Sequence, residues 1–161
     1  MGAVTGSPFV IDYRRWFSFG SGPDEVWSRL MSVDQFEAWW GWLSELQVEG
    51  SCDGQLQPGS VLRGVVAPPL PYRMRLEVDI ERCQRPSEID AAVHGDLEGH
   101  AALRLEPMGG GTRAEVAWTI EMMQRPMRVA ARVAHPVLQW GHDRVVETTV
   151  QSFARVLDDQ R

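Results

Sequence analysis

The last third of the chain repeats apolar residues with the period of an α-helix. Between Arg125 and Arg161, apolar side chains recur every three or four residues, and charged side chains gather on the opposite face. The apolar stripe is formed by Leu138, His142, Val145, Val146, Thr149, Val150, Phe153, Val156 and Leu157. We expect one long helix, which Pro136 bends or divides into two segments. A stripe this wide needs a large apolar surface to cover it.

The middle of the chain repeats apolar residues at every second position, as β-strands do. The pattern is clearest between Tyr72 and Cys83, where charged residues occupy the alternate positions. Short turns and a polar face along each strand favour an antiparallel sheet. Strands are predicted at residues 10–19, 43–49, 61–67, 72–83, 89–94, 97–106 and 112–122.

Two short helices are predicted between the first and second strands. Pro23 suits the first turn of one helix, and the acidic Asp24 favours the positive end of its dipole. The second helix is expected over residues 35–42, with Asp34 as its N-cap. The predicted order is therefore strand, two short helices, six strands and a long helix. The sheet is the one upstream surface that can cover the apolar stripe of that helix.

Composition and charge narrow the class of protein. The chain has 161 residues, which we expect to form a single domain over residues 1–161, with residues 1–8 as a flexible tail. A net charge of −6, without a basic stripe interleaved with aromatic residues, argues against nucleic-acid binding. No apolar run reaches the roughly 18 residues of a membrane span, and no secretory signal is visible. We expect a cytoplasmic protein in which Cys52 and Cys83 are reduced rather than paired.

Four local stretches accompany this order of elements. They are Asp24–Trp27 at the start of the first helix, the hairpin Gly95–Gly99, Gly110–Val116 at the entry to the last strand, and Trp140–Asp143 in the long helix. With these features, nearly the whole chain resembles the START-like superfamily, also called SRPBCC, and within it the polyketide cyclase/dehydrase-like proteins. The four stretches are turn and packing features, so they support the fold more than an activity.

The resemblance implies an α+β helix-grip fold. In that fold a curved antiparallel sheet wraps around the C-terminal helix, two short helices close one end, and an elongated apolar cavity lies between sheet and helix. Members hold lipids, polyketides, hormones or other hydrophobic molecules there. Some cyclise or aromatise polyketides, some carry or sense a ligand, and many have no assigned role, so the fold does not fix the function.

The inward positions of sheet and helix form the candidate ligand-binding set. Their character is apolar with few polar groups, which suits an aromatic or acyl ligand. We expect about half of them to touch a cavity, because wall and core positions have similar compositions. The set is Trp39, Trp40, Met74, Leu76, Val78, Ala91, Val93, Leu103, Trp118, Ile120, His142, Val145 and Thr149.

His142 is the main candidate for chemistry because it lies within the apolar stripe. A neutral imidazole there could bond a ligand oxygen or act as a general base. The alternative is a core histidine bonded to a backbone carbonyl or to a side chain of the sheet. His94 and His100 are expected to face solvent, and His135 precedes the proline of the helix. The histidines and cysteines lack metal-site spacing, so neither a metal nor a cofactor is expected.

Three functional hypotheses follow. The first is a protein that binds a small hydrophobic molecule in its cavity, and whether it forms a homodimer is open. The second is a polyketide cyclase or aromatase-dehydratase, in which His142 or Thr149 assists enolisation or water loss. The third is an interaction protein whose cavity has collapsed. Polar groups converging on His142 would favour the enzyme, and a smooth apolar wall would favour the binding protein.

Overall fold

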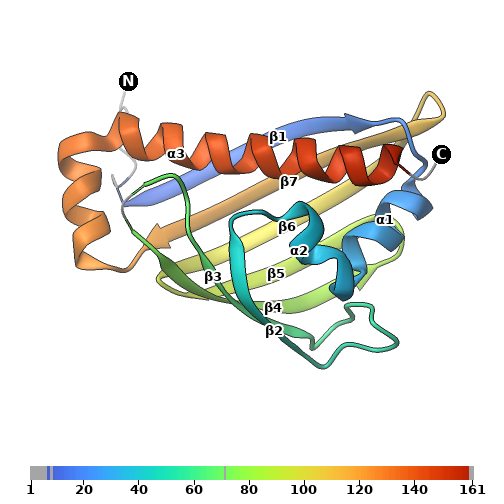
Figure 1. Cartoon of the computed structure of the whole chain (residues 1–161), viewed down its shortest axis with the longest axis horizontal. Helices are drawn as coiled ribbons and strands as arrows, with labels where there is room; N and C mark the ends of the chain where they lie inside the picture. The colour runs from blue at the N-terminus through green and yellow to red at the C-terminus, as the bar shows by residue number, and fades with distance from the viewer. Residues whose placement is uncertain (1–6, 8, 71, 160–161) are drawn as a thin grey trace, which may run out of the picture.

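Seven strands form one antiparallel sheet in the order β1-β7-β6-β5-β4-β3-β2 (Figure 1). The computed structural model describes residues 7, 9–70 and 72–159. Of the expected flexible tail, only Ser7 lies within the described residues. The strands are β1 (Val10–Phe19), β2 (Leu43–Glu49), β3 (Val61–Val66), β4 (Met74–Gln84), β5 (Glu88–Gly95), β6 (Leu97–Met108) and β7 (Gly111–Met122).

The helices lie on one face of this sheet. They are α1 (Pro23–Met31), the short 3-10 helix η1 (Val33–Gln35), α2 (Phe36–Trp39) and α3 (Arg125–Asp158). Figure 1 shows the second part of α3 running along the length of the sheet, with α2 tucked beneath it. A curved antiparallel sheet that holds a long C-terminal helix is the helix-grip arrangement, and the predicted fold class is confirmed.

The long helix α3 bends near its start. Ala134 has φ −136° and ψ 41°, which is outside the helical region, and Pro136 follows two residues later. Proline has no N–H to donate, and its ring collides with the carbonyl four residues earlier, so the helix breaks at this point. The segment before the bend turns sharply away from the segment after it (Figure 1). The bend or break predicted at Pro136 is confirmed.

The second short helix differs from its prediction. The chain forms η1 and then the four-residue α2, which ends at Trp39 rather than Trp42. Asp34 lies inside η1, and the residue that caps α2 is Gln35, whose side chain makes no capping bond. Tertiary packing outweighs the capping preference here, because Phe36 and Trp39 are both buried.

Two irregularities in the strand pairing help the sheet to curve around α3. The register shifts in β2 between Ser44 and Gln47, and in β4 between Ile80 and Arg82. Such bulges bend a strand and increase its twist, which lets a sheet wrap around a helix. At the other edge, β1 and β7 pair without a shift, and Tyr13 lies directly opposite Trp118. This regular pairing brings two aromatic rings together beneath α3.

The apolar core consists of two clusters rather than one. One gathers α1, α2 and the end of α3 around Phe36, Trp39 and Phe153. The other gathers the start of α3 and the ends of β4 and β7 around Met122 and Met127. Both thiols of the chain are free, and among the described residues no helix combines the length and the apolar character that crossing a bilayer requires. The candidate site lies in the space between the two clusters.

Candidate functional site

A cavity of about 370 Å³ lies between the inner face of the sheet and α3. Its volume falls in the range of about 300–1,000 Å³ that is typical of small-molecule sites. Side chains of both core clusters contribute to its wall, including Trp39 and Phe153 from one and Met122 and Met127 from the other. The wall is almost entirely hydrocarbon. An apolar space of this size favours a ligand that water solvates poorly.

Most of the predicted ligand-binding set lies on this wall. The residues placed there are Trp39, Trp40, Met74, Leu76, Leu103, Trp118, Ile120, His142, Val145 and Thr149.

Three members of the set lie outside the wall and pack into the core instead. Ala91 is buried in the cluster around Phe36, Val93 is buried in the cluster around Met127, and Val78 packs against both. Their side chains point inward as the strand period requires, but neighbouring core side chains cover them. The alternation of apolar and polar residues therefore predicted the correct face of the sheet, but it did not distinguish core positions from cavity positions.

Other wall residues were not among the predicted set. Phe17 and Phe19 reach the cavity from β1, and Tyr72 reaches it from the loop between β3 and β4. The two-residue spacing of the phenylalanines was a usable signal for the first strand. Tyr72 alternates in phase with Met74 and Leu76, so the two-residue period of the strand predicted at residues 72–83 was a usable signal for it as well. The further additions are Ile11, Leu30, Val66, Pro68, Leu97, Ala114, Val116, Met122, Met127, Leu138, Val146, Val150 and Phe153.

His142 is held at both ring nitrogens by protein groups. Its Nε2 accepts a hydrogen bond of 3.0 Å from Trp118 Nε1, and its Nδ1 lies 3.1 Å from Asp143 Oδ1. An indole nitrogen can only donate, so Nε2 carries no proton and the neutral ring donates from Nδ1 to Asp143. Burial lowers the pKa of His142, and the contact with Asp143 offsets this only in part. The neutral ring is the stable form at neutral pH.

An aromatic group fixes this histidine from the sheet side. Tyr13 stacks on Trp118 with ring centroids 4.5 Å apart, and it meets His142 edge-on at 5.0 Å. Burial raises the pKa of the Tyr13 phenol, Arg15 lowers it, and Asp143 and Glu147 raise it further. The phenol therefore stays protonated. This group ties β1 and β7 to the middle of α3, and Trp118 and His142 of the group line the cavity.

The opposite side of the cavity is formed by the α2 aromatics. Trp39 and Trp40 stack with centroids 5.5 Å apart, and Trp39 meets Phe153 of α3 edge-on at 5.0 Å. Two polar atoms of the wall are buried without a hydrogen-bond partner, namely Trp39 Nε1 and Thr149 Oγ1. Buried polar atoms normally find partners, so these two are exceptions within an otherwise apolar wall.

A loop between β3 and β4 reaches α3 near the bend (Figure 1). Pro68 and Tyr72 of this loop line the cavity. Between them, Leu70 packs so closely against Gly141 of α3 that any Cβ at position 141 would overlap its side chain. A larger residue at this position would displace the Leu70 side chain from the helix.

The other three histidines lie away from the cavity wall. Among the described residues, no group of three histidine, cysteine or carboxylate side chains could hold a metal ion. His94, His100 and His135 are exposed at the surface, as expected for the first two. His94 is engaged with Glu98, and that hydrogen bond raises the pKa of the imidazole.

Comparison with known proteins identifies the fold. No protein-family model matches the chain, and no curated protein does. Among solved structures, a protein of Thermus thermophilus aligns with a TM-score of 0.75 at 14% identity, covering 93% of this chain and 99% of that chain. Ara h 8.0201 aligns with a TM-score of 0.67 at 14% identity, covering 93% and 99%.

A protein of Rhodobacter sphaeroides has a TM-score of 0.64 at 21% identity and covers 98% of this chain and 97% of that chain. These alignments extend over nearly the full length of both partners, but the identities are low. They show that the chain is a helix-grip protein, and they carry no statement about its ligand.

Proposed function

We propose that this protein binds a small hydrophobic molecule in the cavity beneath α3. The observation that carries the proposal is the cavity itself, which has a volume of about 370 Å³ and an apolar wall. Leaving such a space empty costs van der Waals contacts on all sides, and an apolar ligand restores them. An open cavity of this size gives no support to the hypothesis of an interaction protein with a collapsed interior.

The unpaired wall atoms favour a particular kind of ligand. Trp39 Nε1 can only donate, so it requires an acceptor such as a carbonyl or ether oxygen. Thr149 Oγ1 can donate or accept. The stacked Trp39 and Trp40 rings offer an aromatic surface beside these groups. Together they favour an aromatic or acyl molecule that carries at least one oxygen.

Membership of the START-like superfamily belongs to this proposal. The element order, the four local stretches and the full-length similarity to helix-grip structures support it. Cyclase chemistry receives less support, because both nitrogens of His142 are engaged by Trp118 and Asp143 and the ring cannot take a proton from a ligand without breaking a bond. Thr149 alone provides no base.

The test is native mass spectrometry of the purified protein, followed by denaturing extraction of any retained molecule. We expect a bound hydrophobic molecule, or, for protein purified empty, saturable binding of an oxygen-bearing aromatic or acyl ligand. Val145→Phe enlarges a wall residue and should weaken binding by about fivefold or more, since overpacking typically costs about 1–3 kcal/mol.

Val133→Phe is the matched control, because Val133 lies on the same helix with 83% of its surface exposed. It should bind as the wild type does. A protein that retains nothing and binds no member of an aromatic and acyl panel would contradict the proposal, as would equal binding by Val145→Phe.

A further inference from the structure

The exposed apolar side chains of this protein gather around the bend of α3. Seven large hydrophobic side chains are exposed in the described part of the chain, and five lie between Met123 and Trp140. In α3 the exposed fractions are 62% for Val129, 83% for Val133, 51% for Val137 and 56% for Trp140. Exposed hydrophobic side chains are normally isolated from one another on a protein surface, so a group of them in one region indicates an interaction site.

The same stretch carries a charge opposite to that of the protein. From Met122 to His142 there are three arginines and no aspartate or glutamate, whereas the chain as a whole has a net charge of −6. The rest of the chain therefore carries −9. A basic stretch in an acidic protein is attracted to anionic partners.

Two of the three arginines keep their charge available. Arg128 pairs with Glu121 at 2.7 Å and lies over the Phe9 ring at 4.8 Å. Arg132 lies over the same ring at 5.2 Å, and neither it nor Arg125 makes an ion pair with any described carboxylate. Both are exposed. The charge of this region is thus directed to solvent.

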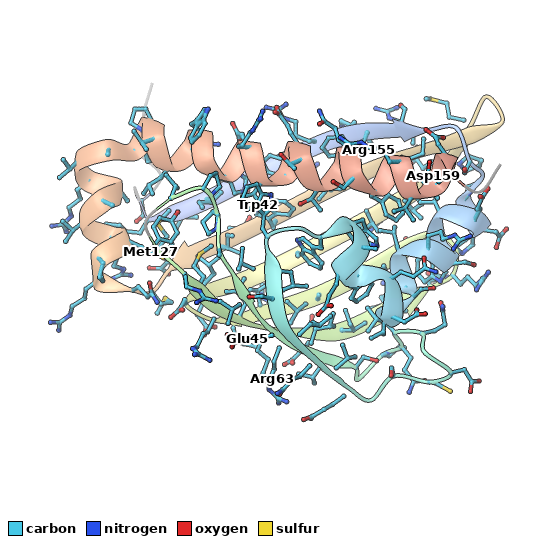
Figure 2. The ribbon with its side chains drawn as sticks, in the orientation of Figure 1. Trp42, Glu45, Arg63, Met127, Arg155 and Asp159 are labelled. Atoms are coloured by element: carbon cyan, nitrogen blue, oxygen red, sulfur yellow. The ribbon has the colours of Figure 1, made fainter. Side chains whose placement is uncertain are left out.

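The bend places these groups at one end of the molecule. Val129 and Val133 are four residues apart and share a face of the first segment, and Val137 and Trp140 are three apart and share a face of the second. Figure 1 shows the bend at the end opposite to α1 and the C-terminus of α3. Figure 2 labels Met127 in the first segment and Arg155 near the far end of the helix.

We propose that this docking surface, formed by Met123, Val129, Val133, Val137 and Trp140 with Arg125 and Arg132, binds the surface of an anionic lipid bilayer. Valine and methionine side chains can enter the acyl boundary, and a tryptophan is stable at the level of the headgroups. The arginines then face lipid phosphates. Met127 and Leu138, on either side of the bend, are buried and line the cavity, so a docked molecule holds this end of its cavity next to the membrane.

A second copy of the chain fits this surface less well. In a symmetric dimer the same patch meets itself, so one interface would hold the arginines of both copies. The stretch offers no carboxylate to compensate them. An anionic bilayer satisfies the charge and the apolar side chains together.

The experiment is sedimentation of the protein with sucrose-loaded vesicles of phosphatidylcholine alone or with 30% phosphatidylserine. We expect the wild type to sediment with the anionic vesicles, to do so more weakly in high salt, and to remain in solution with the neutral ones. Arg125→Gln with Arg132→Gln should lower the partition coefficient roughly twentyfold or more, since each basic residue contributes about fivefold. Val133→Asp should lower it as well.

Matched controls exist for both kinds of change. Trp16→Gln removes another exposed aromatic side chain, on the far face of the sheet, and Arg75→Gln with Arg155→Gln removes two exposed arginines elsewhere. Both controls should sediment like the wild type. All replaced side chains are exposed, so an unchanged melting temperature will confirm that each variant is folded.

Three results would overturn the proposal. One is no sedimentation with anionic vesicles. Another is equal loss in the controls, which would indicate attraction without a defined surface. The third is a concentration-dependent dimer in analytical ultracentrifugation that Val133→Asp abolishes, which would assign the surface to a second copy. Docking is measured without a cavity ligand, so its failure and a failure of ligand binding are distinguishable.

Discussion

The neutral form of His142 is required for its contact with the sheet. Trp118 donates to Nε2, and a proton on that nitrogen would leave two donors facing each other. Because burial depresses the pKa of His142 below its ordinary value of 6.5, the unfolded chain takes up the proton first as the pH falls. The stability that the neutral ring provides is therefore present above about pH 6.5 and is lost as the pH falls through the folded-state pKa.

His142→Gln should remove this loss, because the amide oxygen can still accept from Trp118 and does not titrate. We expect its free energy of unfolding to fall less than that of the wild type between pH 7 and pH 5, as measured by urea denaturation at each pH. His94→Gln is a control that should change the pH dependence of the unfolding free energy in the opposite direction. The pKa of His94 is raised by Glu98, so its contribution is present at low pH and lost as the pH rises. Equal slopes in the wild type and His142→Gln would contradict the assignment.

At the scale of elements, the close approach of Gly141 and Leu70 controls the loop that lines the cavity. Gly141→Ala adds a methyl group where the Leu70 side chain lies, so that side chain must shift, which weakens the contact between α3 and the loop that carries Pro68 and Tyr72. We expect a bound apolar dye to dissociate several-fold faster in stopped-flow measurements. Stability should change little, because alanine favours a helix by about 1 kcal/mol over glycine and offsets part of the strain.

Gly41→Ala is the matched substitution, since a Cβ there meets nothing within 4 Å. Its dissociation rate should equal that of the wild type. If Gly141→Ala releases the dye no faster than Gly41→Ala does, the loop does not limit exchange.

The elements themselves were largely predictable because each has a strong local cause. The two-residue period predicted β4, and Pro136 predicted the bend of α3. The N-cap predicted at Asp34 was wrong, because burial of Phe36 and Trp39 determines where the short helix forms. Alternation also placed Ala91 and Val93 on the inner face, but it could not tell a wall from a core, because that depends on how neighbouring side chains fill the space. The contact between Trp118 and His142, 24 residues apart, has no sequence pattern at all.

At the scale of the whole molecule, charge and shape are arranged along the long axis. The bend of α3 and its exposed apolar residues lie at one end, and α1 with the C-terminus of α3 lies at the other (Figure 1). A molecule of net charge −6 with a basic end has a directed field, which orients it as it approaches an anionic surface. The orientation predicted from charge is the one that presents the exposed valines and Trp140 first.

The cavity separates the two core clusters, and this division has a consequence for the lifetime of the protein. A ligand between the clusters joins them into one core, and binding to the folded state alone adds about 2.7 kcal/mol at a hundred times the dissociation constant. Limited proteolysis should therefore cleave the ligand-free wild type markedly faster than the occupied one, while Val145→Phe gains no protection from added ligand. Identical cleavage rates would mean that the clusters unfold independently of the cavity. Where the two rates differ, a cell that runs short of the ligand degrades its binding protein sooner, and the amount of this protein follows the supply of the molecule it holds.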